Sequence, residues 1–304
     1  MKIAVLGTLS IHLVAEVDRL PRPGEMVPSR GVGREPGGTG TLQAIAAARL
    51  GAEVTLYGRV GADPFGDEIL SSLRGAGVEI AAVERSVRDP TGASLLLIEP
   101  TRQFLAAQAG GANGGVDEAY IARFLPPIRE ADAVLLDLAI PAPALASLLA
   151  GLPPARPIVV LHPIPPRDLS LPWERVDFLV GSREALASPT AGSSPEEAAR
   201  AGQALLTRGV RSVVITAGPD GAYLIEGAGA TRFPGHSLPV VDPTGAADAF
   251  RAALAVKLAG GRGPYEAAGF ATAAAALAAA RQGGPLSFPT AAEVQELLAR
   301  PALP

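Results

Sequence analysis

The second half of the chain alternates short apolar segments with helix-forming ones, and this pattern restricts the fold most strongly. Residues 195–208 have helical composition, and several apolar runs have the length of buried strands: 133–138, 157–161, 176–180 and 212–216. Such alternation predicts a mostly parallel sheet with helices on both faces. Ligands of these sheets bind at the carboxyl ends of the strands. We therefore expect a single α/β domain over residues 1–304 with its site along that edge.

A turn followed by a helix carries the most chemistry. Pro239–Val241 is expected to end an extended segment, 242–245 reads as a turn, and a helix is expected from Gly245 to Ala259. The N-terminus of a helix offers free N–H groups and a positive dipole end, which together bind anions. Asp248 follows one turn into the helix, and an anion site beside a carboxylate suits phosphoryl transfer to a hydroxyl. The alternative is structural: Thr244 as the N-cap and Asp248 as an acid that complements the dipole.

A second glycine-containing turn precedes an earlier helix. Gly37-Gly38-Thr39-Gly40 is followed by helix-forming residues 41–50 and by Gly51. This arrangement is typical of phosphate binding, but a simple tight turn has the same composition. The residues alone leave both interpretations open.

Composition excludes several classes of protein. The net charge is −4 and no basic stripe is present, so nucleic acid is not an expected partner. Lys2 and Lys257 are the only lysines and neither lies in a phosphate-binding loop of the Walker A type. The chain has no cysteine, and its three histidines lack zinc-site spacing. The alanine-rich run 267–280 is too short to span a bilayer, and no signal peptide is recognised, so no membrane partner and a cytoplasmic location are expected.

The turn and its helix resemble a known motif. Asp242-Pro243-Thr244-Gly245-Ala246-Ala247-Asp248 is similar to the Asp-Thr-x-Gly-Ala-Gly-Asp motif of the PfkB/ribokinase family of carbohydrate kinases. Residues 37–44 resemble that family's Gly-Gly-Lys-Gly-Ala-Asn-Gln-Ala, and 216–221 resemble its Thr-x-Gly-x-x-Gly nucleotide loop. The Pro-Asp-Gly within 216–221 is also a strong turn signal by itself. The resemblance extends in order through nearly the whole chain.

The resemblance implies a fold. It predicts a ribokinase-like α/β domain whose central, mostly parallel sheet is flanked by helices, with a small β-lid formed by about 9–35 and 91–109. The lid is expected to cover the acceptor site and to form a homodimer contact.

The resemblance also implies an activity, which is phosphoryl transfer from ATP, with Mg²⁺, to a small hydroxylated acceptor. Asp248 becomes the catalytic base, and the amides of Gly245, Ala246 and Ala247 hold the transferring group. The residues expected to bind ATP are Ser182, Thr216, Gly218, Gly221 and Gly245. Those expected around a monovalent cation, K⁺ or a similar ion, are Asp242, Thr244, Ala278, Arg281, Gly283 and Ser287.

The acceptor site is where the chain departs from the family. Its expected lining is Ser10, His12, Gly37, Gly38, Leu42 and Asp137. The family's sugar-binding Asp and two Asn fall at His12, Ser10 and Leu42, its acceptor-binding Glu at Ala139, and its Mg²⁺-organising Asn-x-x-Glu at Ser182 and Ala185. A lost hydrogen-bond partner costs about 1–3 kcal/mol per group left unpaired, so ribose is expected to be a poor acceptor. The alternatives are a nucleoside kinase, whose acceptor base suits an apolar pocket around Leu42, and a nucleotide- or sugar-binding protein with impaired catalysis.

Overall fold

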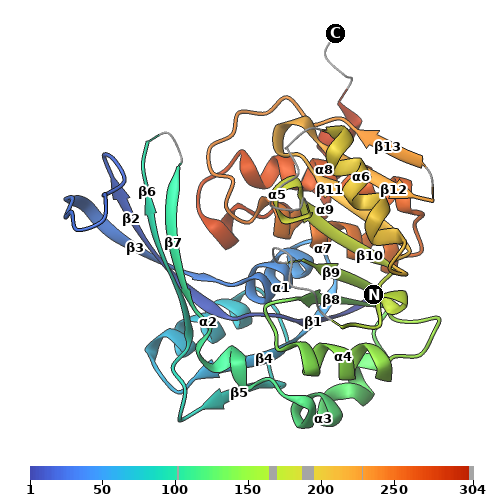
Figure 1. Ribbon diagram of the computed structural model, residues 1–304, viewed down its shortest axis with the longest axis horizontal. Helices are drawn as coiled ribbons and strands as arrows, with labels where there is room; N and C mark the ends of the chain where they lie inside the picture. Colours follow the sequence, from blue (N-terminus) through green and yellow to red (C-terminus); the bar gives the residue numbers. More distant parts are fainter. Residues whose placement is uncertain (101–102, 164–169, 187–194, 228, 301–304) are drawn as a thin grey trace.

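The computed structural model describes residues 1–100, 103–163, 170–186, 195–227 and 229–300. Within them, a nine-stranded sheet carries helices on both faces, and a four-stranded sheet projects from one side (Figure 1). This arrangement is the α/β domain with a β-lid that the sequence predicts.

The central sheet has the strand order β13-β12-β11-β10-β9-β8-β1-β4-β5. All neighbours are parallel except at one edge, where β12 runs antiparallel to both β11 and β13. The strands are β1 (Lys2–Leu6), β4 (Glu53–Gly61), β5 (Val83–Ser86), β8 (Ala133–Asp137), β9 (Ile158–His162), β10 (Phe178–Ser182), β11 (Ser212–Thr216), β12 (Ala222–Glu226) and β13 (Gly229–Phe233). All five residues of β8 are buried, as expected for a strand that helices cover on both faces.

Two hydrophobic cores lie on the two faces of this sheet. Along β1, Ile3 and Val5 belong to one core and Ala4 and Leu6 to the other, as the two-residue period of a strand requires. The helices are α1 (Thr39–Arg49), α2 (Pro64–Gly75), α3 (Glu118–Arg129), α4 (Ala142–Gly151), α5 (Arg183–Leu186), α6 (Pro195–Leu206), α7 (Ala246–Ala259), α8 (Pro264–Ala279) and α9 (Ala291–Ala299), with 3₁₀ turns η1 (Gly111–Gly115), η2 (Trp173–Arg175), η3 (Gly218–Asp220) and η4 (Gly284–Ser287). Residues of α1, α7 and α8 line the first core, and residues of α3 and α4 line the second. No helix in the described part of the chain is long and apolar enough to cross a membrane.

Helix α7 lies inside the domain, not on its surface. It packs against both α1 and α8, and nearly all of its residues from Asp248 to Leu258 are buried. Small side chains such as those of Ala249, Ala252 and Ala253 let the neighbouring helices approach closely. The N-terminus of this helix is therefore held rigidly at the carboxyl edge of the sheet.

The lid is a four-stranded sheet of order β3-β2-β6-β7 (Figure 1). Its strands are β2 (Ser10–Val17), β3 (Ser29–Gly37), β6 (Gly92–Ile98) and β7 (Phe104–Ala109), so the predicted hairpin is present; residues 101–102 of its turn lie outside the described part.

The sequence predicts a glycine-containing turn at residues 37–40. In the structure β3 continues to Gly37, because it pairs with β2 along its length, and α1 begins at Thr39. The extended segment expected to end at Pro239–Val241 is not part of a β-strand: after β13 the chain has no regular structure until α7. The N–H of Val241 donates to the carbonyl of Ala279 at 2.8 Å, at the end of α8.

Candidate active site

The N-terminus of α7 begins at a glycine with a left-handed backbone. Gly245 is the N-cap residue with φ 79°, a conformation that L side chains adopt only with strain. No side chain caps this helix, so Thr244 is not the N-cap; its N–H instead donates to Oδ1 of Asp242 at 2.9 Å. The positive end of the helix dipole is thus left for another partner.

The three amides predicted to hold the transferring phosphoryl group differ in whether they already donate a hydrogen bond. The N–H of Ala246 donates to the carbonyl of Pro243 at 3.1 Å, because the turn closes on itself at that residue. Among the described residues, no backbone acceptor is paired with the N–H of Gly245 or of Ala247. The anion site therefore has two free amides from the predicted set, and the third is engaged within the turn.

Asp248 lies one turn further along α7 and is 8% exposed. Its Oδ1 accepts hydrogen bonds from Nε2 of Gln43, on α1, at 3.3 Å and from Nη2 of Arg251 at 2.7 Å. The carboxylate is thus fixed between two helices, close to the free amides.

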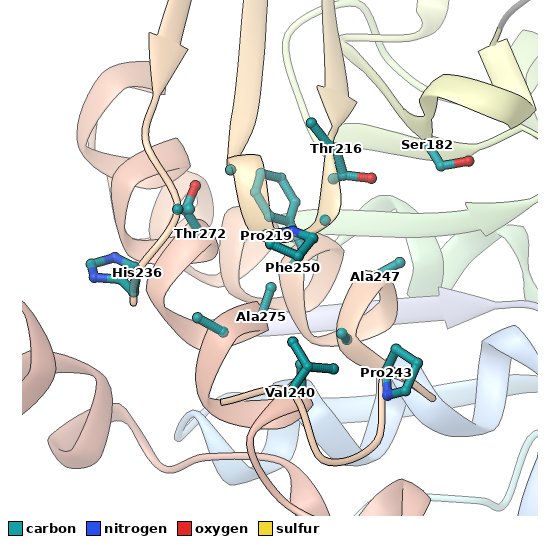
Figure 2. A pocket seen from close by; sticks show the side chains of 17 residues that line it. Ser182, Thr216, Pro219, His236, Val240, Pro243, Ala247, Phe250, Thr272 and Ala275 are labelled. Atoms are coloured by element: carbon teal, nitrogen blue, oxygen red, sulfur yellow. The ribbon is translucent and has the colours of Figure 1, made fainter. Parts of the chain in front are cut away.

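A pocket of about 470 Å³ opens beside the start of α7 (Figure 2). Of the residues expected to bind ATP, Ser182, Thr216, Gly218 and Gly221 line it, and Gly245 does not; Ala246 and Ala247 of the expected phosphoryl site do. The remaining lining is mostly apolar and was not predicted: Ala217, Pro219, Gly235, His236, Val240, Pro243, Phe250, Thr272, Ala275, Ala276 and Ala279. A mostly apolar pocket that includes residues at a helix N-terminus suits a nucleotide, with the base between apolar side chains and the phosphates at that N-terminus.

On the lid side of Asp248, the chain places His12. The N–H of Gly38 donates to Nε2 of His12 at 3.3 Å, so the neutral imidazole carries its proton on Nδ1. Gly37 leaves the space for this ring, because a Cβ there would lie within 2.5 Å of three ring atoms. Burial lowers the pKa of His12, and the charge of Asp248 partly opposes that effect, which shows that the two side chains interact.

Three other residues expected at the acceptor are buried in the structure. Ser10 is 1% and Leu42 4% exposed, and Leu42 packs in the first core. Asp137 is 1% exposed; its oxygens accept from the hydroxyl of Thr8 at 2.8 Å and from the N–H of Ala139 at 2.9 Å. Burial raises the pKa of Asp137, and these hydrogen bonds oppose it. The carboxylate therefore belongs to a buried network beneath the site, and its contact with the acceptor stays a prediction.

The family is decided by a whole-chain comparison. The model of the pfkB family carbohydrate kinases matches residues 1–291. The chain belongs to this family. It is 33% identical over 301 residues to ribokinase of Bacillus subtilis, with 97% of this chain and 99% of that protein covered.

Solved structures agree with this assignment. The structure of ribokinase from Arabidopsis thaliana complexed with ribose and ATP has a TM-score of 0.88 at 28% identity and covers 98% of this chain and 99% of its own. Ribokinase from Thermotoga maritima has a TM-score of 0.87 at 27% identity, with the same coverage. The protein is thus an ATP-dependent carbohydrate kinase with the ribokinase fold.

Two contacts place residues that the resemblance assigns to a monovalent cation in this PfkB-family kinase. The N–H of Asp242 donates to the carbonyl of Ala279, which joins the 242–245 turn to the end of α8. Ser287 is buried and donates to the carbonyl of Gly284. The predicted set is Asp242, Thr244, Ala278, Arg281, Gly283 and Ser287; backbone and side-chain oxygens of such residues suit a hard cation, and the binding of one there stays a prediction. The side chain of Arg281 pairs instead with Glu293 on α9 at 2.6 Å.

The residues Ser182 and Ala185, at the positions of the family's Mg²⁺-organising Asn and Glu, do not form a metal-binding pair. The hydroxyl of Ser182 accepts from the N–H of Ala185 at 3.1 Å, and Ala185 has no side-chain donor atom. No group of three or more His, Asp or Glu side chains that could hold a metal occurs among the described residues. Any Mg²⁺ that accompanies the nucleotide would thus depend mainly on phosphate and water ligands.

Sequence reasoning missed the two side chains that hold the carboxylate of Asp248, those of Gln43 and Arg251. Arg251 lies three residues after Asp248, which is the spacing of neighbours on one helix face, and this signal was available. Gln43 lies 205 residues away from Asp248, so only the packing of α1 against α7 brings the two together. The sequence contains no local sign of that contact.

Proposed function

We propose that this kinase transfers the γ-phosphoryl group of ATP to a hydroxyl of a small sugar or sugar-like acceptor other than ribose. The observation that carries the proposal is the position of Asp248: a nearly buried carboxylate lies one turn from the free amides of an uncapped helix. These two elements are what transfer to a hydroxyl needs, because one removes the proton and the other balances the charge of the phosphoryl group.

The reaction divides into roles for the residues of this chain. Asp248 takes the proton of the acceptor hydroxyl while the oxygen of that hydroxyl forms a bond to the γ-phosphorus of ATP. The bond from that phosphorus to the bridging oxygen breaks, and ADP leaves with the electron pair. The N–H groups of Gly245 and Ala247 donate to the transferring group, and the loop 216–221 holds the nucleotide against α8.

The proposal that ribose is a poor acceptor rests on three positions. An imidazole at His12 presents an Nδ1–H donor where the family has a carboxylate, and Ala139 has no polar side chain where the family has a glutamate. Leu42, in place of an asparagine, is buried in the core. Each hydroxyl of ribose that loses such a partner weakens the free energy of binding by about 1–3 kcal/mol, so three losses outweigh what a small sugar gains from its other contacts.

We also propose that the lid closes over the acceptor and forms a homodimer contact. The residues Val32, Ala15, Leu97 and Leu105 pair in register across β3, β2, β6 and β7 and so form one apolar row. Val32 is 67% and Leu105 49% exposed, which suits coverage by a second copy. Light scattering of Leu105→Arg beside the unaltered protein tests this contact, and an unchanged mass of two chains would contradict it.

The central experiment is acceptor-dependent ADP release over a panel of sugars, sugar phosphates and nucleosides with Mg²⁺ and K⁺. The variant Asp248→Asn is expected to lose kcat by about 10²–10⁴-fold while calorimetry shows unchanged ATP binding, since general-base catalysis contributes this much. Near-normal turnover by Asp248→Asn would remove the base from the mechanism. Ribose as the best acceptor would refute the altered acceptor site, and ATP binding with no acceptor-dependent release would favour a binding protein.

A further inference from the structure

A second charged side chain is buried next to the base. Arg251 lies on α7 and is 3% exposed, and its Nη2 donates to Oδ1 of Asp248 at 2.7 Å. Arginine is almost never fully buried unless it is paired. Ala247 and Phe250, on the adjacent face of the same helix, line the nucleotide pocket, so Arg251 lies away from the nucleotide.

The guanidinium is surrounded by groups from several elements. Its charge acts on Asp137 at the end of β8 and on His162 at the end of β9. Burial, and then the charge of Arg251, lower the pKa of His162 to about 2, so His162 is neutral and cannot neutralise a carboxylate. Nδ1 of His162 lies 3.8 Å from Oδ1 of Asp137. Arg251 is therefore the cation for this buried site.

The other groups that face Asp248 are neutral. Gln43, from α1, donates an amide N–H, and His12, from β2, has a pKa lowered by burial. Neither carries the positive charge that a nearly buried carboxylate needs, because removing a charge from water is costly without a partner. Arg251 alone meets this requirement among the described residues that contact the carboxylate.

The two donors also reach the same oxygen. Gln43 and Arg251 both donate to Oδ1 of Asp248, and within the described part of the chain no donor is placed on Oδ2. Oδ2 is also absent from the fully buried polar atoms that lack a partner, so it keeps access to solvent. A carboxylate held by one oxygen presents the other to an incoming hydroxyl.

We propose that Arg251 is the positioning residue of the base: its guanidinium balances the charge of the Asp248 carboxylate and directs Oδ2 toward the acceptor hydroxyl. The proposal rests on the proposed function, in which Asp248 accepts that proton. The Nε of Arg251 is buried without a partner, and the hydrogen bond to Asp248 comes from the terminal Nη2.

The proposal makes a prediction about pH that a purely structural role would not make. An opposite charge at this distance favours the ionised carboxylate by about 1–3 pH units. Without the guanidinium, this stabilisation of the ionised carboxylate is lost, so the acidic limb of the pH–rate profile should move to higher pH. Activity on that limb is then lost by about tenfold or more, while the loss on the alkaline side is smaller.

The test compares Arg251→Met, which has a side chain of similar length but no charge, with Arg251→Lys, which keeps a charge in another geometry. Gln43→Leu is the matched control, because it removes a neutral donor from the same oxygen. Profiles of kcat from pH 5 to 9 should show the acidic limb displaced by about one unit or more in Arg251→Met, and little displaced in Gln43→Leu and Arg251→Lys. Calorimetry should show unchanged ATP affinity in all three.

Equal acidic limbs in Arg251→Met and the unaltered enzyme would overturn the proposal, even if kcat falls. Two other results would contradict the proposed function itself. One is normal turnover by Asp248→Asn, and the other is an unaltered enzyme that shows no acceptor-dependent ADP release. If Arg251→Met does not fold, the double variant Asp248→Asn, Arg251→Met should fold and show a cooperative thermal unfolding transition, because it no longer buries an unpaired carboxylate. A double variant that also fails to fold would overturn the pairing, and Arg251→Lys and Arg251→Gln would carry the pH measurement.

Discussion

A single methyl group at Gly245 should both destabilise the domain and slow the reaction. Gly245 has φ 79°, and a residue with a side chain in this region costs about 1–2 kcal/mol. A Cβ at this position would lie 2.9 Å and 3.0 Å from two atoms of the Phe288 ring. Phe288 is fully buried and cannot move aside cheaply, so the overlap adds about 1–3 kcal/mol.

The two terms for Gly245→Ala together predict a loss of about 2–5 kcal/mol in the free energy of unfolding. A domain of this size loses about 2–4 °C of Tm per kcal/mol, so the expected fall is about 5–15 °C. Any relief of the contact moves the start of α7, which carries the free amides, and kcat should fall by about tenfold or more, as for a lost anion-hole donor.

Gly261 supplies the matched control at the other end of α7. Its φ is 78°, but a Cβ there would meet nothing within 4 Å. Gly261→Ala should therefore show only the backbone cost, about 1–2 kcal/mol, with normal kcat. Thermal unfolding and ADP release are measured on both variants. Equal Tm losses, or a normal kcat in Gly245→Ala, would refute the argument from the Phe288 contact.

Three further results are expected. Burial lowers the pKa of His162 to about 2, so below pH 6.5 the unfolded chain binds a proton that the folded chain does not, and the folded state loses stability as the pH falls. The variant His162→Gln should lack this loss, which amounts to at most about 1.4 kcal/mol per pH unit. Urea unfolding at pH values from 7.5 to 5.5 measures the difference. Burial raises the pKa of Asp63, but its hydrogen bonds outweigh that effect, so the pKa is lowered. The variant Asp63→Ala loses the N-cap of α2 and should lower the free energy of unfolding by about 0.5–2 kcal/mol at neutral pH, and by less below the lowered pKa. Activity should depend on K⁺, and Asp242→Ala should abolish that dependence; equal rates with a bulky organic cation would remove the site.

The local patterns of the sequence predict the elements that depend on neighbours along the chain. The apolar runs gave β8, β9 and β11 close to their true bounds, and the turn at 242–245 correctly gave the start of α7. These elements follow from side-chain periodicity and from turn residues, which act over a few positions.

Contacts between distant segments could not be predicted in this way. Strand β3 extends to Gly37 because β2 pairs with it, although its own residues are rich in glycine and include Pro36. The burial of Asp137 depends on Thr8, 129 positions earlier, and the attachment of Asp248 depends on Gln43. Motif spacing named candidate residues for the site, but it could not show which oxygen or amide is already engaged in a hydrogen bond.

Helix α7 joins the two halves of the reaction through its periodicity. Residues Ala247 and Phe250 lie three apart on the face toward the nucleotide pocket, and Asp248 and Arg251 lie three apart on the next face, toward the sheet ends. Under the proposed function, one face of this buried helix meets the nucleotide and the next face meets the acceptor. Helices α1 and α8 both pack against α7 and so hold the two faces in a fixed relation. The proposed distance between phosphoryl donor and base is then set by the backbone of one helix and not by the strands of the four-stranded sheet.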